Sequence, residues 1–282
     1  MNTKLVLVDL DGTLLGKDQV KVSERNLQAL HALHERGCEI VPCTGRAVDM
    51  LAPELLALPF IRYVVSSHGA RVYDRVTDQT LYSCLISPED SAKVLAVLEG
   101  RGLYAEVAAD HTIYIEKATE AALSTLPVPS HHVWYMCEDH AYTAVDKPSQ
   151  YFLEHGIGIE KVNLYGIPDA LTQEIYDGLT ATGVIRHTRG AAAKDLEFSA
   201  KNLDKAAAMD VLLRHLGLTY DQTFAIGDSS TDRDVIRMSR IGVAMGNAPE
   251  DIQAVADHVT ARNTEDGFAL AVEQYLLGEE RM

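Results

Sequence analysis

Two carboxylates, Asp9 and Asp11, stand one residue apart directly after the apolar run at residues 5–8. Alternate residues of a strand project to the same side, so these groups would lie about 6 to 7 Å apart at a rise of roughly 3.3 Å per residue. Two like charges that close need a cation or a shared proton to coexist. The pair therefore predicts a site that binds a metal or transfers a proton, and Gly12 allows the chain to turn sharply behind it.

The elements expected to hold this pair are a buried strand at 5–8 and a helix at 23–36, which carries Leu27, Leu30 and Leu33 on one face. Further extended runs, each followed by a polar turn, occur at 39–43, 63–67, 223–226, 241–244 and 258–260. Helical segments separate these runs, so both ends of the chain are predicted to form one parallel α/β sheet covered by helices. Ligands of such sheets bind beyond the carboxyl ends of the strands, where the polar turns lie.

The middle of the chain, residues 84–189, follows a different pattern. Strand-like runs at 102–107, 112–115 and 161–165 accompany two expected helices at 88–101 and 168–182. This pattern predicts an inserted α+β domain within a discontinuous core made of 1–83 and 190–282. The segment 125–130 contains two prolines and is expected to be an irregular connection.

The composition of the chain indicates which binding partners are unfavourable. The chain has 282 residues, is 47% hydrophobic, and carries 25 Lys and Arg against 41 Asp and Glu, for a formal charge of −16. Such an excess of acidic groups disfavours nonspecific binding to nucleic acid or to anionic membranes. The apolar run before Asp9 is too short for a signal peptide and no run reaches the length of a membrane span, so a cytoplasmic protein is expected. Cys38, Cys43, Cys84 and Cys137 are scattered, as is typical of reduced thiols.

Four clusters, in the order 9–13, 44–46, Lys205 and 227–232, resemble the four motifs of the haloacid dehalogenase superfamily. The segments 241–248, 256–257 and 263–267 are similar to the Cof-type branch of sugar-phosphate phosphatases. Thr44 and Lys205 lie 161 positions apart (205 − 44 = 161), and in this superfamily an insertion there implies a large type IIB cap. The resemblance thus implies a Rossmann-like core with residues 84–189 as an inserted cap that selects the substrate.

The same resemblance implies a Mg²⁺-dependent phosphatase of small phosphorylated metabolites, with sugar phosphates as the expected substrates. Asp9 would be the nucleophile and would form an aspartyl-phosphate, while Asp11 would act as general acid and base. The groups expected to bind the phosphate are the backbone at Leu10, the hydroxyl of Thr44, the backbone of Gly45 and the ammonium group of Lys205.

Mg²⁺ would be held by carboxylates at the ends of the strands, because this ion prefers hard oxygen ligands. The expected ligands are Asp9, Asp228 and the backbone carbonyl of Asp11, with Asp232 in support. Arg46, Asn247 and Trp134 are the residues expected to contact the remainder of the substrate. The competing lysines Lys194 and Lys201 lie close to Lys205 in the sequence, and only the spacing before Asp228 and a helix start favour Lys205.

Three other functions remain open at this point. A phosphomutase would use the same nucleophile and return the phosphate to the sugar. A phospho-receiver module also combines an aspartate, Mg²⁺, a threonine and a lysine, although its acceptor would follow a central strand of a single small domain. A catalytically silent binding protein is suggested by departures from the usual motifs at Ala206, Thr231 and His68.

One further cluster lies in the middle domain. His131, His132, Cys137 and His140 surround Trp134, and these are soft ligands that a metal could use. Their spacing matches no closed zinc pattern, so packing or surface positions are the simpler explanation. The aromatic residues Trp134, Tyr135 and Tyr142 could instead contact the leaving group of a substrate.

Overall fold

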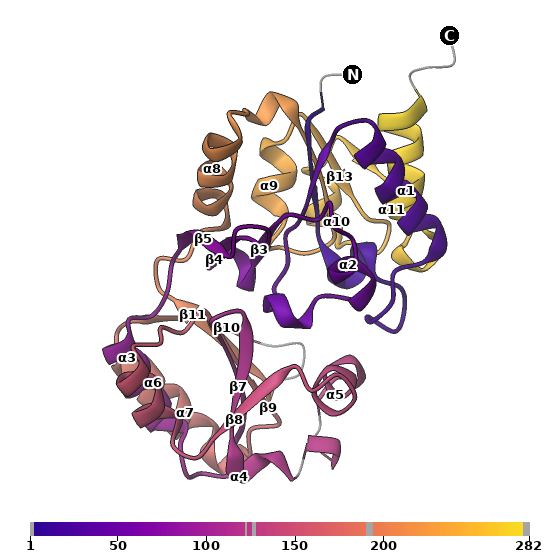
Figure 1. Cartoon of the computed structure of the whole chain (residues 1–282). Coiled ribbons are helices and arrows are strands. Elements are labelled where there is room, and N and C mark those ends of the chain that lie inside the picture. The colour runs from indigo at the N-terminus through magenta and orange to yellow at the C-terminus, as the bar shows by residue number, and fades with distance from the viewer. Residues whose placement is uncertain (1–2, 122, 126–127, 190–193, 279–282) are drawn as a thin grey trace. The chain divides into compact units, whose positions relative to one another are not determined.

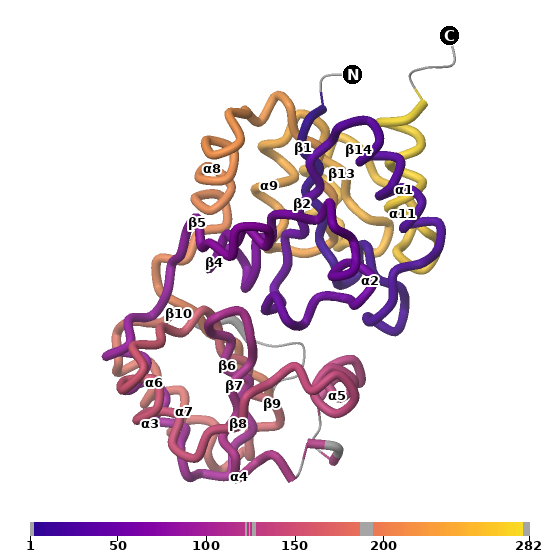
Figure 2. The backbone as a smooth tube through the Cα atoms, viewed as in Figure 1, coloured from indigo at the N-terminus to yellow at the C-terminus, as the bar shows by residue number. Residues whose placement is uncertain are grey.

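The computed structural model describes residues 3–121, 123–125, 128–189 and 194–278. The chain divides into two compact units. The first unit comprises residues up to Gly45, Leu51–Ser83 and the residues from Asp204 onward, and the second comprises Arg46–Met50 and Cys84–Leu203 (Figure 1). Figure 2 follows the chain as it leaves the first unit after strand β5 and returns to it before helix α8.

The first unit is built on a five-stranded parallel sheet with strand order β14-β13-β12-β1-β2. The bounds of these strands are β1 Leu5–Val8, β2 Glu39–Pro42, β12 Thr223–Gly227, β13 Ile241–Ala244 and β14 His258–Val259. Every residue of β1 is buried, as expected for a central strand with helices on both faces. The predicted α/β class and the parallel sheet are therefore confirmed.

The register of the sheet determines which residues meet beyond its carboxyl edge. Val8 of β1 is level with Pro42 of β2 and with Ile226 of β12. The residues that follow these three strands consequently leave the sheet at nearly the same height. This brings the polar turns after β1, β2 and β12 together although they are far apart in the sequence.

Helices cover this sheet on both faces (Figure 1). Their bounds are α1 Glu24–Glu35, α2 Pro53–Leu56, α8 Lys205–Leu216, α9 Arg233–Met238, α10 Glu250–Gln253 and α11 Gly267–Val272. The hydroxyl of Ser23 accepts a hydrogen bond from the backbone N–H of Asn26 and so begins α1. From α8, Met209 and Leu212 pack with Leu5 and Leu7 of β1 in the apolar core.

The predicted strand at 63–67 is present, but it does not extend the parallel sheet as expected. β3 (Tyr63–Ser66) pairs antiparallel with β4 (Arg71–Asp74), which pairs with β5 (Gln79–Ser83). A single parallel bridge between Cys43 and Val65 connects this three-stranded sheet with the end of β2. The turn after β3 has positive φ angles and reverses the chain, which is why the following strand runs antiparallel.

The second unit contains a six-stranded sheet of order β10-β11-β9-β6-β7-β8, which is antiparallel except between β7 and β8. Its strands are β6 Tyr104–Ala109, β7 Thr112–Glu116, β8 Tyr142–Val145, β9 Lys161–Tyr165, β10 Ile185–Arg189 and β11 Leu196–Ala200. Its helices are α3 Pro88–Leu98, α4 Lys117–Glu120, α5 Ser130–Cys137, α6 Pro148–His155 and α7 Asp169–Ala181. Helices α3, α6 and α7 lie side by side along the sheet (Figure 1).

The bounds of this unit differ from the expected 84–189 in two respects. β11 pairs with both β10 and β9, so the second unit continues to Leu203 rather than ending at Arg189. The short segment Arg46–Met50 also belongs to the second unit. Its backbone is attached there because the N–H of Asp49 donates to the carbonyl of His111 over 2.9 Å. Residues 126–127 of the expected irregular connection lie outside the described residues.

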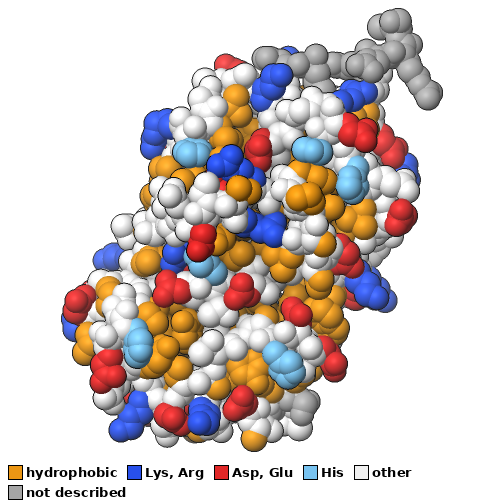
Figure 3. Space-filling view, viewed as in Figure 1, with side chains coloured by type: hydrophobic (Ala, Val, Ile, Leu, Met, Phe, Trp, Pro, Cys, Tyr) orange, Lys and Arg blue, Asp and Glu red, His pale blue; other side chains and the backbone are white. Residues whose placement is uncertain are grey.

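Within the described part of the chain, every helix falls short of the length or the hydrophobicity that a membrane span requires. Acidic and basic side chains are interspersed over the face shown in Figure 3. Among the described residues, Cys38, Cys43, Cys84 and Cys137 form no disulfide. Burial raises the pKa of the Cys43 thiol to about 12, so this thiol remains protonated and a poor nucleophile at neutral pH.

Candidate active site

Asp9 lies at the carboxyl end of β1, between residues that arrive from two other strands. Its backbone N–H donates to the carbonyl of Ile226 over 3.1 Å, which extends the pairing of β1 with β12 by one residue. Its side chain is buried, and a carboxylate oxygen of Asp9 lies within 4.8 Å of carboxylate oxygens of Asp228 and Asp232. Carboxylates this close to one another need a cation or a proton to coexist.

The chain behind Asp9 turns tightly against Asp228. Gly12 has φ +74°, and a Cβ atom added to it would lie 2.3 Å from Oδ2 of Asp228. The hydroxyl of Thr13 donates to Oδ1 of Asp228 over 3.2 Å. The side-chain amide of Asn247 donates to Oδ2 of Asp228 over 3.2 Å and to the carbonyl of Gly12 over 2.8 Å. This turn therefore holds the Asp228 carboxylate in one orientation.

Gly12→Ala is expected to lower kcat/KM on the order of 100-fold. The added Cβ would push the carboxylate of Asp228 out of the position in which the turn holds it. Gly37→Ala is the matched control. Gly37 also has a positive φ (+76°), but a Cβ added there meets no atom within 4 Å. Both variants carry a similar backbone strain of about 1 kcal/mol. Steady-state kinetics and thermal melting of the two variants measure the difference, and equal kinetic effects would contradict the role assigned to Gly12.

Lys205 and Asp232 form a buried ion pair beside Asp9. The ammonium group of Lys205 lies 2.7 Å from Oδ1 of Asp232, and the side chains are only 8% and 5% exposed. Lys205 also donates to the carbonyl of Cys43 over 3.2 Å, at the end of β2. Oδ2 of Asp232 accepts from the backbone N–H and from the hydroxyl of Ser229. The positive charge is thus fixed between the ends of β2 and β12.

The carboxylates crowd one another, and their pKa values change accordingly. Burial, followed by the negative charge of Asp232, raises the pKa of Asp9 well above its usual range, against the opposing effect of Lys205. The same two causes raise the pKa of Asp228 to about 6. Burial alone would lower the pKa of Lys205, but the charges of Asp232 and Asp9 outweigh burial and raise it. The site therefore has more negative charge than Lys205 alone compensates, and it favours an additional cation.

The donor atoms present fit a hard divalent cation. Carboxylate oxygens of Asp9, Asp228 and Asp232 lie within 4.8 Å of one another. Both oxygens of Asp232 already accept hydrogen bonds from Lys205 and Ser229, so this residue suits a supporting position better than a direct one. Among the described residues, the predicted histidine and cysteine cluster around Trp134 does not gather into a comparable group.

Thr44 and Gly45 follow β2 and lie next to the bridge between β2 and β3. Thr44 is fully buried, and its backbone N–H donates to the carbonyl of Val65 over 2.9 Å. The carbonyl of Thr44 accepts from the N–H of His68, also over 2.9 Å. The structure thus brings Thr44 and Gly45 to the same edge of the sheet as Asp9, Asp228 and Lys205.

Arg46 and Trp134, the two residues expected to reach the substrate from outside the core, both lie in the second unit. The guanidinium of Arg46 lies 4.8 Å from the centre of the Tyr135 ring, and its Nη1 donates to the carbonyl of Met50 over 3.0 Å. Trp134 packs edge-on against Tyr135, with 4.9 Å between the ring centres. Asn247, the third residue of this set, instead holds Gly12 and Asp228, and its amide oxygen accepts from the N–H of Asn263.

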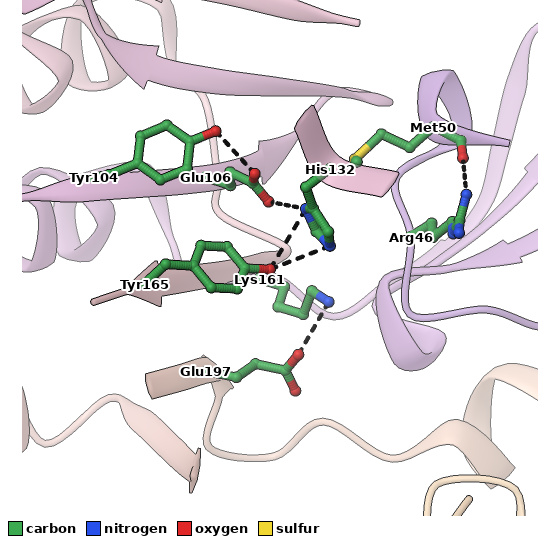
Figure 4. A network of polar contacts seen from close by, with 8 residues as sticks. All are labelled: Arg46, Met50, Tyr104, Glu106, His132, Lys161, Tyr165 and Glu197. Carbon is green, nitrogen blue, oxygen red and sulfur yellow. Dashed lines mark hydrogen bonds and ion pairs between the residues drawn. The ribbon is translucent and has the colours of Figure 1, made fainter. Parts of the chain in front are cut away.

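Figure 4 shows where His132 lies in the second unit. Its Nδ1 is 2.7 Å from Oε2 of Glu106, whose other oxygen accepts from the hydroxyl of Tyr104 over 2.9 Å. The hydroxyl of Tyr165 lies 3.3 Å from Nε2 of His132. Glu106 is 1% exposed, so this carboxylate depends on its two partners for solvation. His132 therefore stabilises a buried acid.

The stability of the second unit is expected to depend on this acid. Burial would raise the pKa of Glu106, but His132 and Tyr104 outweigh it and hold that pKa below its ordinary value of 4.5. A lowered pKa contributes stability that is complete above 4.5 and is lost as the pH falls through the lower value of the folded protein. Glu106→Gln should lower the free energy of unfolding by about 1–3 kcal/mol at pH 7.

Denaturant unfolding at several pH values measures this contribution. The deficit of Glu106→Gln relative to the unsubstituted protein should shrink as the pH falls from 4.5 through the lower pKa of the folded protein, because Glu106 is then protonated in both states. Glu174→Gln is the control, since Glu174 forms an ion pair with Arg101 but is 60% exposed. A deficit that does not depend on pH would show that the charge of Glu106 is irrelevant.

The sequence alone assigned no role to Gln19 or Asn263, which both support the site. Oε1 of Gln19 accepts from the N–H of Gly12 over 3.1 Å, and the side chain of Asn263 donates to the carbonyl of Leu15 over 2.9 Å. Asn263 belongs to the segment 263–267 that resembles the Cof-type branch, whereas no local pattern marks Gln19. Of the departures from the expected motifs, Ala206 lies in the first turn of α8, and Thr231 contacts the hydroxyl of Ser229.

The chain matches the haloacid dehalogenase-like hydrolase family over residues 6–272. It is 30% identical to the phosphatase YwpJ of Bacillus subtilis, and the alignment covers 94% of this chain and 97% of that protein. Among solved structures, a haloacid dehalogenase-like hydrolase from Bacteroides thetaiotaomicron is 25% identical, with a TM-score of 0.81 over 96% of this chain and 99% of the other.

A haloacid dehalogenase subclass IIB sugar phosphatase has the same fold, with a TM-score of 0.72 and 24% identity over 97% of this chain and 99% of the other. These likenesses agree with a parallel-sheet core that carries an inserted α+β unit. The family match extends over nearly the whole chain, and the carboxylates, threonine and lysine meet at one edge of its sheet. The chain therefore belongs to the haloacid dehalogenase-like hydrolases and is an enzyme of the phosphatase type.

Proposed function

We propose that this phosphatase hydrolyses small phosphorylated metabolites, sugar phosphates among them, with Mg²⁺ and through an aspartyl-phosphate on Asp9. The observation that carries the proposal is the environment of Asp9. A carboxyl group is buried at the end of a central strand, close to the carboxylates of Asp228 and Asp232 and to the Lys205 ammonium group that pairs with Asp232. A buried carboxylate beside a fixed cation is suited to attack a phosphomonoester, which is itself an anion.

The reaction would proceed in two steps. A carboxylate oxygen of Asp9 forms a bond to phosphorus as the bond from phosphorus to the leaving oxygen breaks, and Asp11 gives that oxygen its proton. Water then attacks the phosphorus of the aspartyl-phosphate, Asp11 takes a proton from the water, and Asp9 is released with inorganic phosphate. Splitting the displacement in this way replaces one difficult step with two easier ones.

The phosphoryl group would be held by donors that surround Asp9. Lys205 supplies a charge that its contacts with Asp232 and Cys43 fix in place. The hydroxyl of Thr44 and the backbone N–H groups at Leu10 and Gly45 supply neutral donors. Donors fixed before the substrate binds need not reorganise during the reaction, which is the main source of electrostatic catalysis.

Asp9, Asp228 and the backbone carbonyl of Asp11 would hold Mg²⁺, with Asp232 in support. When bound, the ion neutralises charge on the phosphoryl oxygens and orients them for attack. The chain's own contribution is to fix the carboxylate of Asp228, which Thr13, Asn247 and the turn at Gly12 orient. Asn247 accordingly positions a ligand residue and need not contact the substrate.

The second unit would select the leaving group. Arg46 directly follows the Thr44–Gly45 pair in the sequence, and its guanidinium lies against Tyr135 of α5, next to Trp134. Aromatic and guanidinium groups are suited to contact the polar and apolar faces of a sugar or a similar metabolite. Trp134→Ala should therefore change the ranking of substrates, and equal activity on every substrate would exclude this role.

The test is a phosphate-release screen over sugar phosphates, nucleotides and cofactor phosphates, with Mg²⁺ and with EDTA. Release of phosphate that requires Mg²⁺, together with a labelled Asp9 peptide after rapid acid quenching, would support the proposal. Isomerised sugar phosphate without free phosphate would identify a phosphomutase instead. A stable phosphorylated protein that releases no phosphate would indicate a receiver, and neither product would indicate a binding protein.

A further inference from the structure

The turn after β3 is strained in a way that few residues tolerate. Ser67 has φ +49°, His68 has φ +58° and Gly69 has φ +93°. Left-handed backbone costs about 1 to 2 kcal/mol for a residue with a side chain, and here two such residues follow each other. Strain of this kind persists only where the surrounding contacts determine the conformation. The contacts of Ser67, His68 and Gly69 therefore show what this turn holds in place.

Those contacts reach two of the residues proposed to bind phosphate. The backbone N–H of His68 donates to the carbonyl of Thr44 over 2.9 Å. A Cβ atom added to Gly69 would lie 2.8 Å from Cα of Lys205, so this glycine packs directly on the start of α8. The turn thus lies between the loop after β2 and the first residue of α8.

The imidazole of His68 fills the space beside Gly45. A Cβ atom added to Gly45 would lie 2.4 Å from Cε1 and 2.6 Å from Nε2 of His68. The ring edge therefore lies against Cα of Gly45 and limits how the peptide groups on either side of that residue can rotate. Since the backbone N–H of Gly45 is the group proposed to donate to the phosphoryl oxygen, its direction depends on this ring.

We propose that His68 is a positioning residue of the phosphate site, because its imidazole packs against Gly45 and its N–H holds Thr44. The inference rests on the proposed function of Thr44 and Gly45 and concerns the phosphoryl group rather than the leaving group. It predicts that removing the ring weakens binding of every phosphomonoester and of inorganic phosphate by a similar factor. A ring that served only the stability of the turn would change the melting temperature and leave these constants unchanged.

His68→Gly tests this directly. Glycine favours the left-handed backbone at this position, so the variant should fold while the imidazole is lost. We expect KM for two phosphomonoesters with unrelated leaving groups, and the inhibition constant of inorganic phosphate, each to rise about 10-fold as the Gly45 backbone loses its orientation. His140→Gly is the matched control, because His140 is also a histidine with positive φ (+52°) but lies in the second unit.

A double variant provides an independent measurement. Gly45→Ala should be severely impaired, since the new methyl group would overlap the ring of His68. Gly45→Ala combined with His68→Gly should recover at least 10-fold in kcat/KM over Gly45→Ala alone, because the overlap is gone. Additive losses in the double variant would overturn the inference, and so would constants for His68→Gly within twofold of the unsubstituted protein.

The two proposals fail in distinguishable ways. If the proposed function is wrong, the unsubstituted protein releases no phosphate and inorganic phosphate binds to none of the variants. If only the role of His68 is wrong, the unsubstituted protein is active and His68→Gly matches His140→Gly in every constant. A rise in KM for one leaving group alone, with no change in phosphate inhibition, would place the ring against the leaving group and contradict a role in phosphate binding.

Discussion

Asp9→Asn is expected to abolish turnover and to leave the fold intact. An amide is a poor nucleophile toward phosphorus, so kcat should fall on the order of 10⁴-fold or more, as expected when a covalent nucleophile is removed. The fold should survive because the side chain of Asp9 is surrounded by the carboxyl groups of Asp228, Asp232 and Asp11. Replacing one of these like charges by a neutral group of the same shape relieves repulsion, and the melting temperature in EDTA should remain equal or rise.

Phosphate release, thermal melting and mass spectrometry after acid quenching measure the three parts of this prediction. Asp251→Asn is the control, because Asp251 is 63% exposed and pairs with Arg233 on the surface. It should retain full activity and stability within about 0.5 kcal/mol. If Asp9→Asn kept more than a few per cent of the activity, another group would have to be the nucleophile.

Lys205→Met is expected to impair both activity and stability. Removing one member of a buried ion pair leaves Asp232 without its cation, which typically costs about 3–5 kcal/mol. The loss should be large here because Lys205 also faces Asp9 and donates to the carbonyl of Cys43. Turnover should decrease by about 100- to 1000-fold, since a fixed positive charge no longer meets the phosphoryl group.

Urea unfolding in EDTA separates the change in stability from the change in kinetics. Lys201→Met is the matched control, because Lys201 stands four positions earlier and is exposed. Lys201→Met should leave turnover unchanged and should alter the free energy of unfolding by no more than about 0.5 kcal/mol, as a surface substitution does. Equal effects of the two substitutions would contradict the role assigned to Lys205 in the site and its role as the partner of Asp232.

The sequence predicted the elements of the first unit well because their signals are local. The run at 5–8 is uniformly apolar, and Ser23 with Leu30 and Leu33 indicates a capped amphipathic helix, which is α1. The strand at 241–244 was predicted with its observed bounds. Helix caps and apolar periodicity are properties of neighbouring residues, so they can be read without knowing the fold.

The second unit was predicted less completely because its contacts are not local. β11 was missed, and its place in the sheet depends on pairing with β9, which precedes it by more than thirty residues. The histidine and cysteine cluster suggests His132 as a metal ligand, whereas the structure pairs His132 of helix α5 with the buried Glu106 of strand β6. Neither partner carries a sequence signal, because an ion pair between a helix and a strand 26 positions apart follows no fixed spacing.

By itself, the sequence determined the α/β class of the core, the strand ends at which Asp9, Thr44 and Asp228 lie, and the resemblance of their motifs to one superfamily. Only the tertiary structure decided that the carboxylates of Asp9, Asp228 and Asp232 gather within 4.8 Å. It likewise decided that Asp232 holds Lys205 and that His68 packs against Gly45. The physical reason is the distance along the sequence over which each kind of interaction acts. Periodicity and capping act over a few residues, whereas the charge balance of a site depends on strands that the register of the sheet brings together from opposite ends of the chain.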